Sequence, residues 1–187
     1  MAAAWGHTCD QATTAPQASA HRGSGPEAQA LSTALRLDPA ASDADIGQPV
    51  TLHLLIDEAL DLGSFEFTLT YDATRLAISA DNVVLGELLG STGRSATVIG
   101  PQIKVENGVG PLRFGAYTLG ASPAGPNGSG SLAEITFTPL AAGTSEITFT
   151  AAQVTDTTGQ SVDNLALRGA TLRIAPGGPV SLPFVER

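Results

Sequence analysis

The sequence predicts an all-β protein, a two-sheet β-sandwich of about nine strands, and three observations support this class. Apolar and polar residues alternate with a period of two in many segments, which places successive side chains on opposite faces of a strand. These segments recur about every ten residues and are separated by turn-forming residues, with Gly (21) and Pro (12) plentiful. No segment shows the 3.6-residue period of an amphipathic helix. Many short strands without helices are typical of sandwiches.

The clearest strand covers residues 63–72, GSFEFTLTYD. Its aromatic and apolar side chains occupy every second position, so they are predicted to face the core. Phe67, together with Phe137 of a later strand, is predicted to lie in that core on facing or adjacent strands. The side chains between them are small, polar or acidic and are predicted to face solvent or a partner: Ser64, Glu66, Thr68 and Thr70.

The same alternation predicts eight further strands, at residues 34–39, 50–57, 76–85, 96–106, 112–119, 132–140, 146–154 and 165–174. Gly100-Pro101 is expected to break the fifth strand of the chain, and Asn107-Gly108 is expected to form the hairpin turn that follows it. In residues 146–154, Ile147, Phe149 and Ala151 alternate with polar residues. Gly169 is expected to mark a bulge, and residues 40–47 are predicted to be a polar turn region.

Three parts of the chain differ in composition. Residues 1–30 lack either period and are predicted to be a disordered tail or linker. Residues 31–175 are predicted to form the β-sandwich domain. Residues 176–187 are predicted to be a Pro/Gly linker with a short apolar stretch at the end.

Charge and composition exclude several kinds of partner. The net charge of −9 disfavours nucleic acid and anionic membrane surfaces. No apolar run reaches the roughly 18 residues that a membrane span needs, and no secretion signal is visible at the N-terminus. The single cysteine, Cys9, lies in the predicted tail and excludes an internal disulfide.

The sequence does not predict an enzyme. It contains no G-x-S-x-G nucleophile motif, and its cysteine lies in the tail. His53 is expected on the outer face of its strand, with no acidic partner evident from the sequence. Glu66 and Glu134 are the acidic residues that could form a carboxylate pair for glycoside hydrolysis, but charged residues on strand surfaces are ordinary. No catalytic residue is therefore assigned.

The sequence also contains residues that could bind calcium or a glycan. Asp156, Asp163 and Asn164 cluster in one loop and supply the oxygen ligands that calcium prefers, although Asp and Asn are common in turns without a metal. We assign no metal ligand, and calcium stays a candidate cofactor. Glycan binding is weakly supported because Trp5 lies in the tail and Tyr71 is expected to point inward, which leaves Tyr117 as the exposed ring.

The order of several sequence blocks resembles that of the cohesin domain, the receptor module of cellulosome scaffoldins and related bacterial surface proteins. The resemblance covers about residues 34–174. Residues 65–76, FEFTLTYDATRL, resemble the block F-x-x-x-Y-D-P-x-x-L, with Ala73 in place of the usual proline. Residues 130–137, GSLAEITF, resemble G-x-L-A-x-I-x-F. Shorter blocks with the same order lie at residues 46–50, 112–116, 143–147 and 154–159.

The resemblance implies a nine-stranded jelly-roll sandwich that binds, without catalysis, a dockerin module carried by another extracellular protein such as a polysaccharide-degrading enzyme. It further implies an extracellular or cell-surface location. The resemblance implies that one flat sheet face, formed by residues 63–72, 96–99 and 112–119, meets the dockerin. The contact residues predicted on this face are Ser64, Glu66, Thr68, Thr70, Arg113, Gly115 and Tyr117. A carbohydrate-binding module and a passive spacer domain of a surface protein are the alternatives.

Overall fold

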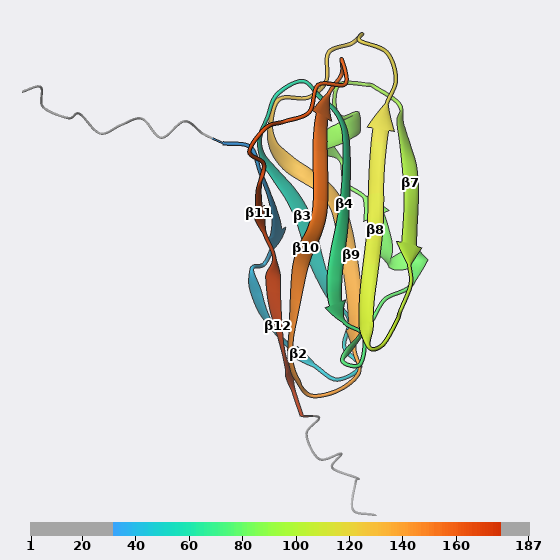
Figure 1. The fold of residues 1–187 in the computed structure, drawn as a ribbon, viewed down its shortest axis with the longest axis vertical. Coiled ribbons are helices and arrows are strands. Elements are labelled where there is room, and N and C mark those ends of the chain that lie inside the picture. The colour runs from blue at the N-terminus through green and yellow to red at the C-terminus, as the bar shows by residue number, and fades with distance from the viewer. Residues whose placement is uncertain (1–31, 177–187) are drawn as a thin grey trace, which may run out of the picture. The chain divides into compact units, whose positions relative to one another are not determined.

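The computed structural model describes residues 32–176. The predicted tail, residues 1–30, lies outside the described residues, as does the predicted linker beyond Pro176. In the described part, strands pack in two layers (Figure 1), which confirms the predicted all-β sandwich. Two 3-10 turns, Ala80–Asn82 and Leu88–Gly90, are the helical elements of this part. None of its helices is long and apolar enough to span a membrane.

The first sheet has the strand order β11-β1-β3-β9-β5, and β6 also pairs with β9. Its strands are β1 (Ala34–Asp38), β3 (Val50–Ala59), β5 (Leu76–Ala77), β6 (Val83–Leu85), β9 (Gly128–Pro139) and β11 (Ala166–Arg168). All pairs in this sheet are antiparallel except β1 with β11.

The second sheet has the order β2-β12-β10-β4-β8-β7. Its strands are β2 (Ala41–Asp45), β4 (Leu62–Asp72), β7 (Ala96–Ile103), β8 (Val109–Thr118), β10 (Gly143–Asp156) and β12 (Ala170–Ala175). The pair of β2 with β12 is parallel and the other pairs are antiparallel.

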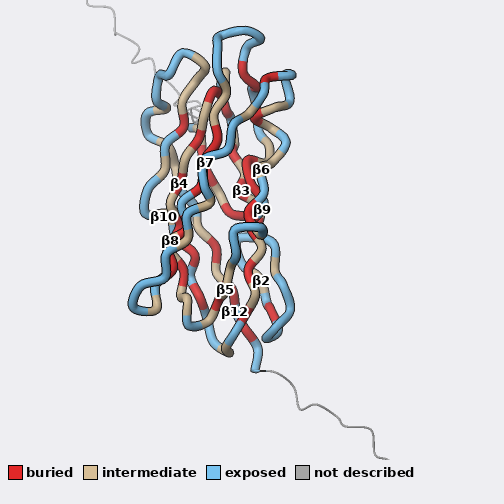
Figure 2. The backbone as a smooth tube through the Cα atoms, turned by 90° about the vertical axis from the view of Figure 1, so that its right-hand side faces the viewer, coloured by how far each residue is buried: buried red, intermediate tan, exposed pale blue. Residues whose placement is uncertain are grey.

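The core lies between the two sheets and is built as the alternation predicts. Buried segments follow the strands, whereas the loops at both ends are mainly exposed (Figure 2). Phe67 on β4 and Phe137 on β9 belong to different sheets, and both are almost completely buried. Tyr71 packs edge-on against Phe137, with ring centroids 5.2 Å apart. These contacts confirm that both phenylalanines are core residues.

Residues 32–176 contain twelve strands rather than the nine predicted, for two reasons. The predicted strand at residues 76–85 is divided into β5 and β6 by a 3-10 turn, and the one at 165–174 is divided into β11 and β12 at Gly169. The third additional strand, β2, lies in residues 40–47, which were wrongly predicted to be a turn. β2 has only Ala44 buried, so it lacks an apolar alternation that the sequence could show.

Two details of the predicted strands differ in the structure. Gly100-Pro101 interrupts the pairing of its strand with β8, as expected, but does not end the strand, because β7 continues to Ile103 after a register shift between Ile99 and Gln102. A proline is tolerated there since β7 is an edge strand. In β10 a second shift, between Phe149 and Ala151, reverses the alternation. Ala151 is therefore exposed rather than inward. The Asn107-Gly108 hairpin turn is confirmed, since both residues have positive φ.

A single aspartate ties three loops together at one end of the sandwich. Asp61 follows the β3 strand with φ 48°. Its carboxylate accepts hydrogen bonds from the Gly125 amide, at 2.6 Å, and the Thr157 hydroxyl, at 2.5 Å. Its own amide donates to Asn127 Oδ1 at 2.8 Å. These contacts fix the β3–β4, β8–β9 and β10–β11 connections relative to one another.

Acid is expected to destabilise the domain through three aspartates. The pKa of each carboxyl is lowered, chiefly by a threonine hydroxyl that donates to it: Thr157 to Asp61, Thr74 to Asp72 and Thr158 to Asp156. Because the folded-state pKa lies below the unfolded value of about 3.9, their stabilisation is complete above that pH and is lost as the pH falls through the folded value.

The measurement is the free energy of unfolding by urea between pH 7 and pH 2, for the wild type and Asp61→Asn. We expect the wild type to lose stability below about pH 4. We expect the difference between the two proteins to shrink over the same range, since protonation removes the charge that the substitution removes. A difference that is constant with pH would contradict this account.

Candidate functional site

The outer face of β10, β4, β8 and β7 forms one continuous polar surface, here called the polar face. The strand register arranges its side chains in rows across the sheet. The three central rows are Thr155–Ser64–Tyr117–Thr97, Gln153–Glu66–Gly115–Ile99 and Ala151–Thr68–Arg113–Gln102. Thr148, Thr70 and Pro111 form the next row. The structure thus brings the seven sequence-predicted site residues together on one face.

Glu66 and Arg113 form an ion pair at the centre of this face. Arg113 Nε donates to Glu66 Oε1 at 2.6 Å, from a position one row away on the neighbouring strand. The bond and the charge of Glu66 raise the pKa of Arg113. Both side chains remain more than one-third exposed. The sequence placed both residues on the face but did not predict that they neutralise each other.

Two hollows adjoin Glu66. One is lined by residues of all four strands of the face, including Ile99, Tyr117 and Thr155. The other lies towards β10 beside Ala151. Replacing Gly115 by a larger residue would force the backbone of β4 to move, since a Cβ at this position would lie 2.7 Å from Phe65 O and 3.1 Å from Glu66 Cα. Because glycine has no side chain, nothing projects from the sheet at this position beside Glu66.

Hydroxyl pairs along the face satisfy one another. Ser64 and Thr155 are 2.7 Å apart, and Thr70 and Thr148 are 3.0 Å apart. Cross-strand pairs of this kind stabilise the sheet and hold the side chains in fixed positions. The contribution of β10 to the face was missed by sequence reasoning, whereas the resemblance already implied that residues 96–99, which lie in β7, belong to it. Strand order was the missing information, since alternation shows which side chains point outward but not which strands are neighbours.

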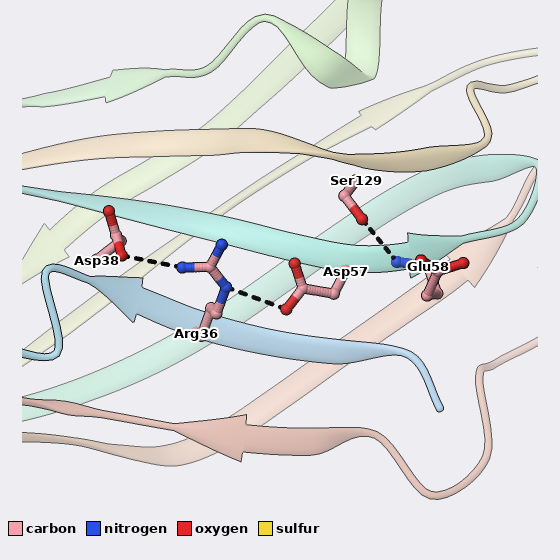
Figure 3. Close-up of polar contacts among 5 residues, drawn as sticks. All are labelled: Arg36, Asp38, Asp57, Glu58 and Ser129. Carbon is pink, nitrogen blue, oxygen red and sulfur yellow. Dashed lines mark hydrogen bonds and ion pairs between the residues drawn. The ribbon is translucent and has the colours of Figure 1, made fainter. Parts of the chain in front are cut away.

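The outer face of the other sheet carries a separate cluster (Figure 3). Arg36 Nε donates to Asp57 and its Nη1 donates to Asp38, both at 3.0 Å. Nearby, the Glu58 amide donates to Ser129 Oγ at 3.1 Å. These contacts join β1, β3 and β9. Arg36 thus resembles Arg113 chemically but lies away from the polar face, which makes it a suitable control.

His53 does have an acidic neighbour, contrary to the sequence interpretation. The register places Glu134 opposite it, with 3.7 Å between His53 Nδ1 and Glu134 Oε1. Both side chains are exposed, and no hydroxyl of the described residues hydrogen-bonds to His53. The pair therefore lacks a nucleophile to activate. Glu66 and Glu134 lie on different sheets, on β4 and β9, so they do not form a carboxylate pair.

The calcium candidate loop is organised by hydrogen bonds within the protein. Asp156 Oδ1 accepts from the Thr158 amide and hydroxyl and from the Gln160 amide, at 2.7–2.9 Å. Across residues 32–176, no group of three or more acidic, His or Cys side chains has an arrangement that could hold a metal ion. Asp156 acts here as a turn-stabilising residue.

Flat aromatic surface for stacking a sugar is scarce in the described domain. Tyr71 is 3% exposed, and Tyr117 is half-buried between its neighbours on the polar face. Trp5 lies outside the described residues. A single partly covered ring does not form the platform that ring stacking requires, so the described surface does not favour glycan binding.

These features define the class of the protein: a two-sheet β-sandwich with an ordered polar face on the outer side of one sheet. The model of the cohesin domain family matches residues 36–170. The chain therefore belongs to the cohesin domain family. A search of curated proteins found no significant match.

Solved cohesin structures share this fold. A non-cellulosomal cohesin from Archaeoglobus fulgidus is 22% identical with a TM-score of 0.59, over 78% of this chain and 93% of its own. The second type II cohesin of the ScaA scaffoldin from Acetivibrio cellulolyticus is 18% identical with a TM-score of 0.63, over 80% and 99%. The cohesin of a type I cohesin–dockerin complex from Clostridium thermocellum is 13% identical with a TM-score of 0.58, over 78% and 100%.

Proposed function

We propose that this cohesin domain binds a dockerin module of another extracellular protein, such as a polysaccharide-degrading enzyme, through the polar face. The seven contact residues proposed are Ser64, Glu66, Thr68, Thr70, Arg113, Gly115 and Tyr117. The observation that carries this proposal is their convergence, by strand register, on one shallow surface. Several similar structures are cohesins crystallised with dockerins.

The surroundings of the face support this use. Side chains on a regular sheet are held by their strands and by cross-strand hydroxyl pairs, so little conformational entropy is lost when a partner docks. Tyr117 supplies a ring with a polar end, which is a frequent residue at interfaces. The low positions at Gly115 and Ala151 leave room for side chains of a helix. An extracellular or cell-surface location is part of the proposal.

Glu66→Arg is the sharpest single test of the site. It places a second guanidinium beside Arg113, so like charges repel at the centre of the face without any change in the core. We expect binding to weaken about tenfold or more, a loss of at least ~1.4 kcal/mol. The free energy of unfolding should fall by no more than about 1 kcal/mol, the usual range for an exposed ion pair. The measurement is calorimetry against the dockerin modules encoded in the same genome.

Tyr117→Ala is measured beside it, and Arg36→Ala on the opposite sheet is the control. A dockerin that binds all variants as tightly as the wild type would place the site elsewhere. If none of these dockerins binds the wild type, the module does not bind dockerin and the spacer alternative becomes the better account.

A further inference from the structure

The polar face is electrically neutral although the chain carries a net charge of −9. Its four rows contain two charged residues, Glu66 and Arg113, and these form an ion pair. The remaining side chains in the rows are hydroxyls, amides, small residues, one proline, one tyrosine and Ile99. The nearest acidic residues of these strands, Asp72, Glu146 and Asp156, lie just beyond the first or the last row. The rows themselves therefore carry no net charge.

The paired charges of Glu66 and Arg113 limit which partner groups can bind at the centre of the face. A cation of the partner that approached Glu66 would also meet the positive charge of Arg113, whose Nε lies 2.6 Å from Glu66 Oε1, so the attraction is largely offset. A partner anion at Arg113 would meet the opposing charge of Glu66 in the same way. A hydroxyl or amide carries no net charge to be repelled and can hydrogen-bond to either member of the pair. The hollow lined by Ile99 and Tyr117 further suits an uncharged side chain.

We propose that this face recognises a neutral partner surface, rich in hydroxyl and amide groups, with one apolar side chain seated beside Gly115. Specificity then comes from shape and hydrogen bonding, and the Glu66–Arg113 pair binds as an intact neutral unit. This inference rests on the proposed function, since the partner is the dockerin module. It adds that the charges of this pair are not matched by opposite charges on the dockerin.

A double-mutant cycle tests the proposal directly. The variants are Glu66→Gln, Arg113→Gln and the double variant, measured by calorimetry against the dockerins of the same genome. Each single variant leaves one unpaired charge to be desolvated on binding, so we expect each to weaken binding about tenfold. The double variant restores a neutral hydrogen-bonded pair, and its affinity should lie within about threefold of the wild type.

Arg36→Gln, in the ion pairs of the opposite sheet, changes the net charge as Arg113→Gln does and should leave binding unchanged. The wild-type Kd should change less than about threefold between about 0.01 M and 1 M salt, over which the screening length falls from about 30 Å to about 3 Å. Thermal unfolding confirms that each variant is folded.

Two results would overturn the inference. If the loss of affinity in the double variant equals the sum of the losses in the two single variants, the partner uses the two charges separately. Tighter binding by Arg113→Gln would show that a partner cation competes with Arg113 for Glu66. Failure of every dockerin to bind the wild type is a different outcome, because it rejects the proposed function on which this inference rests.

Discussion

Phe67→Ala should cost about 3–5 kcal/mol of folding free energy, which is enough to unfold a marginally stable domain. Phe67 is 1% exposed and lies at the centre of an aromatic cluster. Its ring centroid is 6.4 Å from that of Phe65, 5.9 Å from Phe114 and 6.4 Å from Phe149. The sheets on both sides are fixed by their hydrogen bonds, so the space left by the ring cannot close completely.

Urea unfolding of the variant, or its recovery as soluble folded protein, measures the effect. Thr68→Ala is the matched control on the same strand, since its side chain points to the polar face and its loss should cost less than about 0.5 kcal/mol. A folded Phe67→Ala protein with a loss as small as that of the control would mean that the register of β4 is wrong by one residue.

Arg94→Ala is expected to cost about 2–4 kcal/mol, because it removes a buried guanidinium that closes the loop after β8. Arg94 is 6% exposed. Its Nε donates to Thr118 Oγ1 at 2.8 Å, and its other nitrogens donate to the carbonyls of Gly120 and Pro123. Thr118 in turn donates to Gly63 O at 3.1 Å. Without the arginine, these acceptors lose their partner and its volume is left empty.

Arg94→Lys distinguishes the geometry of the side chain from its charge. A lysine keeps the charge but cannot reach three acceptors with a planar fork, so we expect it to recover only part of the lost stability. Arg36→Ala, which removes an exposed arginine from two ion pairs, should cost less than about 1 kcal/mol. Equal losses for Arg94→Ala and Arg36→Ala would show that the buried contacts of Arg94 contribute little.

Alternation in the sequence predicted the fold class and most of the strands because burial repeats locally, every second residue. β4 illustrates this, since its inward residues are buried and its outward residues are half-buried, as the pattern of two requires. β2 could not be predicted in the same way. Its parallel pairing with β12 joins segments more than a hundred residues apart, and its own sequence has almost no apolar face.

Alternation in the sequence also predicted part of the candidate site. The sequence identified which side chains of β4 and β8 point outward, and the resemblance suggested that the two strands are neighbours. The Glu66–Arg113 bond and the rows from β10 and β7 depend on register, which no single segment reveals. Arg94 and Asp61 were missed because each acts on loops that are distant in sequence.

The central claim is that the polar face of β10, β4, β8 and β7 binds dockerin, and an NMR titration of the labelled domain with a dockerin that it binds tests this most directly. The account predicts that the largest amide shifts fall on the rows around Glu66 and Arg113, from Gln153 across to Ile99. The outer residues of β1, β3 and β9, including Arg36, should remain unchanged. Shifts concentrated on β1, β3 and β9, with the polar face unaffected, would contradict the claim.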